Sequence, residues 1–564
     1  MQLKSFLAAA VALAISGATP GDARSNSGAY LAARQAGIQN DFAAAVEYYT
    51  RALTLDNANP VLLESVVLSN LAMGWIDRAV PVARRLQGTV AQSQVAEMVL
   101  VAGEIAEERY EDIIAAYADG RNAGPLIDGL VQAWSHIGKG DADAAFEAFD
   151  AVAAEKGLHS FAYYHKALAH AMAGDYEGAE ALLSGEAQGE LVLPRRGVIA
   201  HAQVLSQLDR NDEALALIGL RFGATPPPVM ADLADQLEAG ENVDFEIATT
   251  AKQGLAEVFL SVAGALYGEA APSYTLIYSR IAEHLDPENV DAILLSATLL
   301  DSLEQYDLAT ETYDRVAADD PDFISAELGR ADALLSAERE EAAVEVLNQL
   351  AKLHPETYGV QLALADTLRR LEKFEEATPV YDRVIALIGE PGEDSWGLFF
   401  SRGITLERTD RWEEAERDFR QALELRPDQP QVLNYLGYSM VELQVNLDEA
   451  LEMIETAVIG RPNDGYITDS LGWVLYRLGR YEEAVVHMER AAELMPVDPI
   501  INDHLGDVYW AVGRQLEAQF QWRRALSFDP EPEEAERIRR KLEVGLDVVL
   551  EEEGAEPIAV ADEG

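Results

Sequence analysis

Residues 471–496 read LGWVLYRLGRYEEAVVHMERAAELMP, and residues 505–530 read LGDVYWAVGRQLEAQFQWRRALSFDP. The two segments carry glycine, alanine and proline at matching places, each pair 34 residues apart: Gly472 and Gly506, Gly479 and Gly513, Ala484 and Ala518, Ala491 and Ala525, Pro496 and Pro530. A fixed period of this length is the sequence signature of an array of small stacked units. The fold is therefore predicted to be built from one repeated element.

The same frame extends toward the N-terminus over almost the whole chain. It gives fourteen repeats, which start at residues 26, 60, 94, 126, 160, 195, 256, 290, 324, 358, 396, 430, 465 and 499. The repeats that start at 94, 126 and 195 match least well. The twentieth position is alanine in twelve of the fourteen, allowing one inserted residue before Ala450, and the exceptions are Ile113 and Thr275.

The repeat resembles that of the tetratricopeptide repeat (TPR) family. The positions of that family's motif are occupied here by Leu471-Gly472, Leu475, Tyr481, Ala484, Met488, Ala491 and Pro496. The resemblance implies an all-α fold, a TPR α-solenoid in which about fourteen helix–turn–helix repeats stack into a right-handed superhelix. Small side chains let the two helices of a repeat approach closely, and the proline ends the second helix.

Two features interrupt the frame and predict the domain organisation. Residues 219–255 contain three consecutive prolines, Pro226 to Pro228, and no clean repeat. Glu533 to Leu550 is predicted to be a solvent-facing helix that caps an open stack. We therefore expect the solenoid in two segments, with these boundaries: 1–23 signal peptide, 24–222 N-terminal solenoid, 223–255 Pro-containing joint, 256–530 C-terminal solenoid, 531–550 capping helix and 551–564 disordered acidic tail.

The first residues predict export from the cytoplasm. Lys4 precedes the apolar stretch Phe6 to Ile15, and small residues follow it, with Gly21-Asp22-Ala23 as a cleavage site and Ser16-Gly17-Ala18 as a second option. This is the pattern of a secretory signal peptide. No later segment reaches 18 apolar residues, the length that indicates a membrane span. The mature protein is therefore expected to be periplasmic or secreted, without integral membrane insertion and with outer-membrane association only through partners.

The charge of the chain narrows the class of partner. The formal net charge is −55 and the isoelectric point is near 4.3. So acidic a surface repels phosphate backbones, which excludes nucleic acid as a partner, and it attracts basic protein surfaces. The chain has no cysteine, so thiolate metal sites and a cysteine nucleophile are excluded.

Motifs of known catalytic chemistry are absent from the sequence. It has no phosphate-binding loop of the GxxxxGK[ST] type, no GxSxG and no HExxH. His165 and His170 are five residues apart, a spacing that does not place both on one helix face, and we expect them, with His201, to be ordinary surface histidines. We therefore predict no enzyme activity, no metal site and no cofactor, and proteins as the partners.

In TPR folds the first helix of each repeat lines the inner groove of the superhelix. In this frame the last three repeats place aromatic and acidic residues there, beside a strip of arginines. The predicted protein-binding groove consists of Asn434, Tyr438, Asp469, Trp473, Tyr476, Asp503, Asp507, Trp510, Arg369, Arg370, Arg408 and Arg477. The first repeats instead offer an apolar set that either binds a partner or packs on a neighbouring repeat: Val61, Leu68, Leu71, Val95, Met98, Ile105, Ile127, Trp134, Ile137, Phe161, Tyr164 and Leu168.

The C-terminal repeats are similar to those of Gram-negative envelope TPR proteins, which include an outer-membrane adaptor that activates a C-terminal-processing protease. The resemblance implies a scaffold or adaptor that presents substrates to a periplasmic protease. Those adaptors are lipoproteins, whereas this chain has no cysteine to acylate. The alternative is a structural component of an envelope assembly or exopolysaccharide-export machine.

Overall fold

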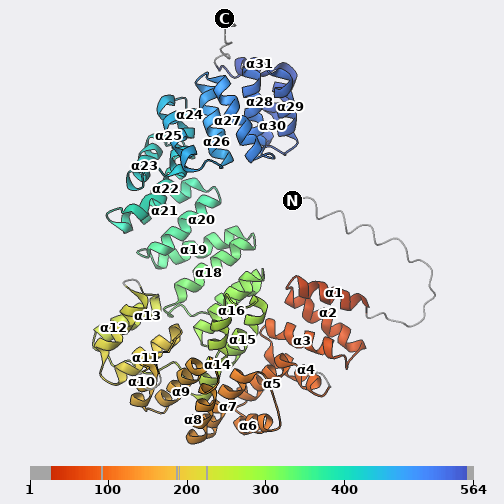
Figure 1. Ribbon diagram of the computed structural model, residues 1–564, viewed down its shortest axis with the longest axis vertical. Coiled ribbons are helices and arrows are strands. Elements are labelled where there is room, and N and C mark those ends of the chain that lie inside the picture. Colours follow the sequence, from red (N-terminus) through yellow and green to blue (C-terminus); the bar gives the residue numbers. More distant parts are fainter. Residues whose placement is uncertain (1–26, 90–92, 186–188, 190, 224–225, 556–564) are drawn as a thin grey trace, which may run out of the picture. The chain divides into compact units, whose positions relative to one another are not determined.

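The computed structural model describes residues 27–89, 93–185, 189, 191–223 and 226–555 (Figure 1). These residues form helices joined by short connections, and none of them lies in a strand, which confirms the predicted all-α solenoid. The predicted signal peptide and most of the predicted acidic tail lie outside the described residues. Among the described helices, none combines the length and the apolar character needed to cross a bilayer.

The chain forms two compact units, residues 1–346 and 347–564, and each is described here by itself. The boundary falls inside helix α19 (Glu340–Leu353), so the predicted joint at 223–255 does not separate the units. Residues 223–255 belong to the first unit, because described residues among them pack against and form hydrogen bonds with other parts of that unit. Phe245 and Ile247 are buried, and the backbone N–H of Glu246 donates to the side chain of Gln203 at 3.2 Å.

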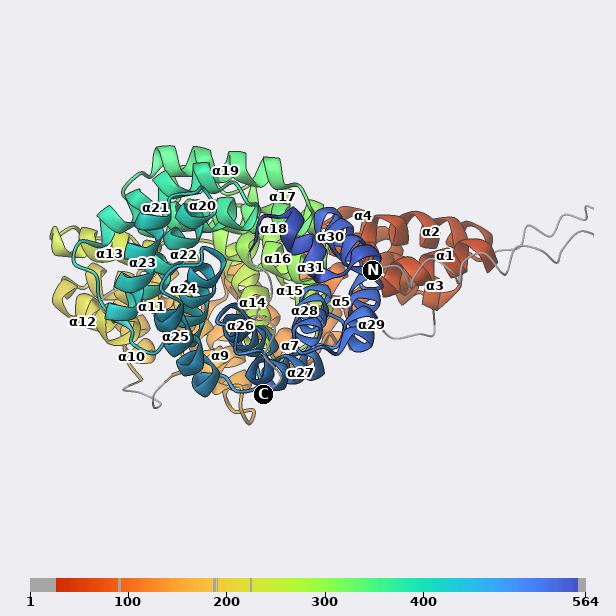
Figure 2. The same ribbon diagram turned by 90° about the horizontal axis from the view of Figure 1, so that it is seen from above.

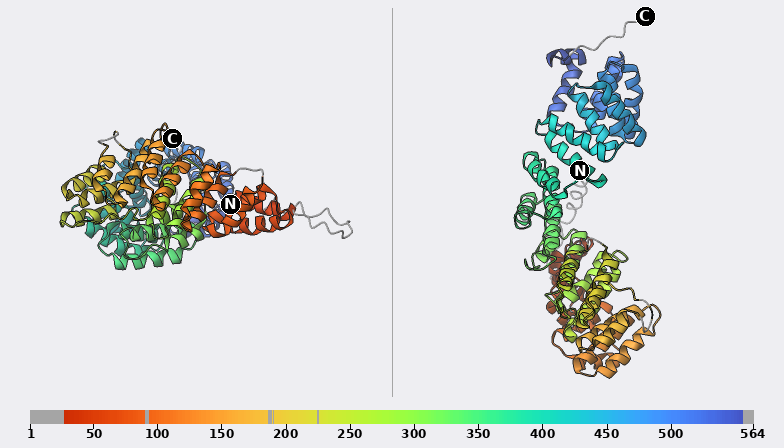
Figure 3. Two further views of the ribbon diagram at one scale, coloured as in Figure 1. Left: turned by 90° about the horizontal axis from the view of Figure 1, so that it is seen from below. Right: turned by 90° about the vertical axis from the view of Figure 1, so that its left-hand side faces the viewer.

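Unit 1 is a series of helical hairpins in which most helices pack against the next one in the chain (Figures 2 and 3). Its helices are α1 (Ser27–Ile38), α2 (Phe42–Leu55), α3 (Pro60–Ala72), α4 (Ile76–Gln87), α5 (Gln94–Ala106), α6 (Tyr110–Ala118), α7 (Pro125–Lys139), α8 (Ala142–Ala153), α9 (His159–Met172), α10 (Tyr176–Leu183), α11 (Arg195–Gln207), α12 (Asn211–Phe222), α13 (Pro228–Glu238), α14 (Ala251–Leu266), α15 (Pro272–Leu285), α16 (Val290–Ser302), α17 (Tyr306–Tyr313) and α18 (Phe323–Ser336).

Unit 2 continues the same pattern after α19. Its helices are α20 (Tyr358–Arg370), α21 (Phe374–Ile388), the 3₁₀ turn η1 (Glu393–Ser395), α22 (Trp396–Glu407), α23 (Trp412–Leu425), α24 (Pro430–Glu442), α25 (Leu447–Gly460), α26 (Gly465–Arg477), α27 (Tyr481–Leu494), α28 (Pro499–Ala511), α29 (Gln515–Leu526), α30 (Pro532–Val544) and α31 (Leu546–Glu552). All fourteen predicted repeats are helical hairpins, and the first helix of each begins within one residue of the predicted start except α14, which begins five residues early.

The alanine of each repeat lies where its two helices meet. The side chain at the twentieth position is at most 1% exposed in every repeat whose burial is described: Ala45, Ala79, Ala145, Ala179, Ala214, Ala309, Ala343, Ala377, Ala415, Ala450, Ala484 and Ala518. Glycine on the facing helix also lets the two helices of a repeat approach closely, since a Cβ on Gly472 would lie 2.7 Å from Cγ of Met488. A larger residue at either place forces the helices apart.

The turn inside each hairpin uses at least one residue with a left-handed backbone. In the turn between α26 and α27, Gly479 has φ = 74°, and the N–H of Arg480 donates to the carbonyl of Leu475 at 2.9 Å. This bond satisfies a carbonyl that the end of a helix would otherwise leave unpaired. In several repeats a glutamate takes the place of glycine, such as Glu304 with φ = 61°.

The inner row of helices in unit 1 surrounds two helices from later in the chain. Helix α14 packs against α5, α7 and α9, and α15 packs against α3 and α5. The contact is close, because the indole of Trp134 lies directly against the backbone of Gly254. The chain therefore fills the inner face of its first repeats with its own helices.

Candidate protein-binding face of unit 2

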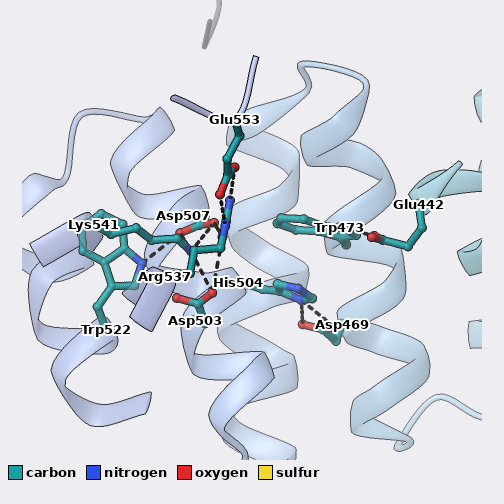
Figure 4. A network of polar contacts seen from close by, with 10 residues as sticks. All are labelled: Glu442, Asp469, Trp473, Asp503, His504, Asp507, Trp522, Arg537, Lys541 and Glu553. Atoms are coloured by element: carbon teal, nitrogen blue, oxygen red, sulfur yellow. Dashed lines mark hydrogen bonds and ion pairs between the residues drawn. The ribbon is translucent and has the colours of Figure 1, made fainter. Parts of the chain in front are cut away.

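The inner row of unit 2 ends in α24, α26 and α28, whose side chains form a continuous polar network (Figure 4). The ring of Trp473 stacks on the imidazole of His504 with 4.0 Å between centroids, and its Nε1–H donates to Glu442 at 2.8 Å. Nδ1 of His504 lies 2.9 Å from a carboxylate oxygen of Asp469. Each polar end of these aromatic rings is therefore bound by a carboxylate of a neighbouring helix.

The second half of the network joins α28 to α30. Nζ of Lys541 lies 2.7 Å from Asp503 and 2.7 Å from both oxygens of Asp507, and the lysine side chain is buried. Nη1 of Arg537 lies 3.5 Å from Asp507. The indole N–H of Trp522 also donates to Asp507 at 2.9 Å. Two acids four residues apart on α28 thus face two bases four residues apart on α30.

The pKa values in this network follow from burial and pairing. Burial raises the pKa of the Asp503 carboxyl, against the opposing effect of Lys541. Burial alone would lower the pKa of His504, but the adjacent Asp469 carboxylate raises it above its ordinary value of 6.5. The imidazolium form of His504 is therefore favoured in the folded protein.

The structure brings together five of the predicted groove residues but leaves them covered. Asp469, Trp473, Tyr476 and Asp507 are buried, and Asp503 is partly buried within the polar network. The prediction that the capping helix faces solvent is wrong for one of its side chains, because α30 inserts Lys541 into the groove. It also breaks at Gly545, where φ is 89°, and α31 follows, whose Asp547 accepts the indole N–H of Trp510 at 2.9 Å.

Sequence reasoning missed Lys541, Arg537 and His504. A signal for the first two was present, since Arg537 and Lys541 repeat on α30 the four-residue spacing of Asp503 and Asp507 on α28. Opposite charges at matched helical spacing indicate two faces that pair. Nothing in the sequence placed His504 on the ring of Trp473.

Four predicted residues line a cavity that stays open. It has a volume of about 360 Å³, and Arg408, Asn434, Tyr438 and Asp469 are among the residues that line it. Tyr466 and Ile500 also line it, and both are exposed, at 56% and 44%. Oδ1 of Asn434 is buried and has no hydrogen-bond partner among the described residues.

The predicted arginine strip is only partly assembled. Arg369 donates to the hydroxyl of Tyr381 at 3.1 Å, and the guanidinium of Arg408 lies 5.3 Å from the centre of the Phe374 ring. Arg370 is exposed at the end of α20. Arg477, in the last turn of α26, lowers the pKa of Tyr438, although burial raises that pKa overall.

The apolar set predicted for the first repeats mostly packs inside unit 1. Met98, Ile105, Trp134, Tyr164 and Leu168 are buried, and the helices that cover their row are α14 and α15. Val61 and Leu68 remain exposed, at 57% and 37%.

His165 and His201 are buried, which corrects the prediction that both lie on the surface. Nδ1 of His165 accepts from the indole N–H of Trp134 at 3.2 Å, and its Nε2 lies 3.1 Å from Oγ of Ser261.

Comparison with known proteins identifies the repeat. Profiles described as tetratricopeptide repeat match residues 30–59, 130–189, 294–356, 328–391, 400–465 and 469–496. The TPR repeat-containing protein PA4667 of Pseudomonas aeruginosa is 33% identical over 87 residues, which is 15% of this chain and 15% of that protein. The chain therefore matches only a small part of this relative's length.

Solved structures match the chain at low sequence identity and with low TM-scores. A chain of the APC/C hetero-tetramer Cut9–Hcn1 matches with a TM-score of 0.36 and 14% identity, over 92% of this chain and 96% of that one. MamA from Desulfovibrio magneticus RS-1 matches with a TM-score of 0.28 and 18% identity, over 30% of this chain and 94% of that one.

Proposed function

Because the chain belongs to the tetratricopeptide repeat superfamily, we propose that it is a non-catalytic scaffold or adaptor that binds other proteins. Stacked helical hairpins offer extended surfaces for partners. The surface that we assign to this role is the open cavity of unit 2, between α22, α24, α26 and α28.

The unpaired amide oxygen of Asn434 is the observation that carries the assignment. A buried acceptor without a partner costs about 1–3 kcal/mol. Because Asn434 lines the open cavity, a rotation of its amide would present this oxygen to an incoming chain, which could donate to it without displacing any side-chain hydrogen bond of that oxygen. The exposed Tyr466 and Ile500 add apolar surface to that cavity, as is common where proteins bind one another.

Charge favours a basic partner segment. The ionisable side chains that line the cavity include the acids Glu407, Glu442, Asp469 and Asp498 and one arginine, Arg408. The whole chain carries a formal charge of −55, which steers cationic surfaces toward it. We therefore propose a peptide segment that carries lysine or arginine, and whose attraction weakens as salt increases.

The cell envelope is the proposed place of action, and the presentation of substrates to a periplasmic protease is the proposed role there. The signal-like segment at residues 1–23 supports the first proposal. Mass spectrometry of the protein purified from its native host tests it, since cleavage after Ala23 leaves Arg24 as the first residue. An intact Met1 would contradict export.

Site-specific photo-crosslinking in cells tests the binding face. A benzoylphenylalanine at Ile500, which lines the cavity, is expected to capture a partner, whereas the same group at Leu516, 83% exposed on α29, is not. Asn434→Leu should abolish the capture at Ile500 without changing expression. Equal capture at both positions, or capture that survives Asn434→Leu, would contradict the proposed face.

A further inference from the structure

Unit 1 holds a second cavity, beside α14, that neither the repeat pattern nor the proposed partner binding uses. Its volume is about 610 Å³, which lies within the range of about 300–1,000 Å³ that is usual for small-molecule sites. Side chains from α9, α14 and α16 and from the segment that precedes α11 line it. The apolar part of the wall consists of Phe161, Leu193, Pro194, Leu260 and Leu295.

One end of the cavity is a fixed polar cluster. Nε of Arg196 donates to Glu257 at 2.7 Å, and the hydroxyl of Tyr164 donates to the same carboxylate at 2.9 Å. Arg195 binds Asp291, and its Nη2 also donates to Asp322 at 2.9 Å. Its Nη1 makes no hydrogen bond to any residue that the structure describes. Arg195 lines the cavity and thus keeps one N–H group that the hydrogen bonds of its Nε and Nη2 to Asp291 and Asp322 do not use.

A glycine lies in the wall of the cavity. Gly264 is in the last turn of α14, and a Cβ placed on it would meet no atom within 4 Å. A larger residue at this position therefore has room for its Cβ beside the cavity.

The charged side chains around the cavity disfavour an ionic ligand. The cluster holds two guanidinium groups, Arg195 and Arg196, and three carboxylates, Glu257, Asp291 and Asp322. An anionic ligand would meet a net negative cluster in a chain of formal charge −55. A cationic ligand would compete with two arginines whose pairs are already formed, and Arg196 is partly buried within the cluster.

From this geometry we infer that the cavity beside α14 binds a small uncharged amphiphile. Its aliphatic or aromatic body fills the apolar wall, and a carbonyl or hydroxyl oxygen accepts a hydrogen bond from Nη1 of Arg195. The site lies in unit 1 and is separate from the proposed protein-binding face of unit 2, so either can fail without the other.

Fluorescence binding of the neutral probe N-phenyl-1-naphthylamine to the full-length protein tests the inference. We expect saturable binding at one site, and displacement by 1-decanoylglycerol below its aggregation limit. Gly264→Leu fills the cavity from a position where the side chain meets no clash, and it should weaken binding at least about tenfold. Gly219→Leu is the matched control, since Gly219 lies on α12 with nothing within 4 Å and does not line the cavity.

Each outcome decides the inference. Circular dichroism and a thermal melt should show both variants folded, because neither substitution introduces a clash. Probe binding that Gly264→Leu leaves unchanged would overturn the site. Displacement by decanoate as strong as by 1-decanoylglycerol would overturn the uncharged ligand class. Stronger displacement by the blocked dipeptide N-acetyl-Leu-Phe-amide would overturn the small amphiphile in favour of a peptide side chain.

Discussion

At the scale of single residues, the largest energies lie in charges that are buried in pairs. Lys541 has no exposed side-chain surface and balances Asp503 and Asp507. The pair of acids could not remain ionised in that position without it, because isolated buried charges are strongly disfavoured. Lys541 is therefore expected to fix α30 in the groove of unit 2.

Lys541→Met should destabilise the docking of α30 by about 3–5 kcal/mol, because it removes the buried base and leaves Arg537, 3.5 Å from Asp507, as the remaining base beside the two carboxylates. Hydrogen–deuterium exchange of α30 in the full-length protein measures the effect. Lys352→Met, at an exposed lysine of α19, is the control and should change nothing. The double variant Lys541→Met with Asp507→Asn should recover part of the lost docking stability. If hydrogen–deuterium exchange of α30 were unchanged in Lys541→Met, apolar contacts alone would hold α30 in place.

His165 gives unit 1 a predictable dependence on pH. Burial lowers the pKa of His165 from 6.5 to about 3. Nδ1 of His165 accepts the indole N–H of Trp134. A proton on Nδ1 would therefore point at another N–H donor, which further disfavours the charged imidazolium form. When folding lowers the pKa of a histidine, the neutral histidine contributes its full stabilisation at pH values above the pKa of the unfolded state. That stabilisation is lost as the pH falls below the pKa of the unfolded state.

Unit 1 should therefore lose about 3 kcal/mol from this one group between pH 6.5 and pH 4. His165→Gln is expected to be less stable than the wild type at pH 7 but to lose less on acidification. Urea unfolding at several pH values, followed by the fluorescence of the buried Trp134 region, measures the difference. Equal pH dependence in both proteins would contradict the assignment of the loss to His165.

At the scale of elements, the hairpin turns show how the repeat tolerates unfavourable residues. The left-handed backbone costs an L-residue about 1–2 kcal/mol relative to the right-handed one. Glycine avoids this cost at Gly479, whereas Glu304 adopts the same conformation between α16 and α17. The 2.9 Å bond from the N–H of Gln305 to the carbonyl of Leu300 holds that turn closed.

Glu304→Gly should stabilise unit 1 by about 1 kcal/mol, after the greater freedom of glycine in the unfolded chain is allowed for. Glu311→Gly, at an exposed position within α17, should have the opposite effect and destabilise by about 1 kcal/mol. Chemical denaturation of both variants and of the wild type provides the comparison. Destabilisation by both substitutions would contradict the strain assigned to Glu304.

At the scale of the whole molecule, charge repulsion is the dominant long-range force. A formal charge of −55 in 564 residues opposes compaction of both units. The local ion pairs at arginines, such as Arg480 with Glu483 at 2.7 Å, offset only part of this repulsion, because solvent screens exposed pairs.

The melting temperature should therefore rise when sodium chloride is increased from 20 mM to 500 mM, because the Debye length falls to a few ångströms and screens the repulsion. Differential scanning calorimetry at several salt concentrations measures the shift. Potassium chloride at equal ionic strength is the control and should give the same rise. A melting temperature that falls with salt would mean that attractive ion pairs outweigh the repulsion.

The sequence by itself determined the repeated element. The 34-residue spacing, the alanine at position 20 and the proline after many of the second helices are local features of a helical hairpin, so they can be recognised without any distant contact. For this reason the helix starts at 430, 465 and 499 were predicted to the residue.

Only the tertiary structure decided which inner faces stay open. Trp134 against Gly254, and Lys541 between Asp503 and Asp507, join segments that are far apart in the chain. The repeat pattern assigns inner positions in the same way whether or not another helix covers them. What covers a surface depends on where the stack curves back on its own chain, and that is a property of packing among many repeats rather than of any one of them.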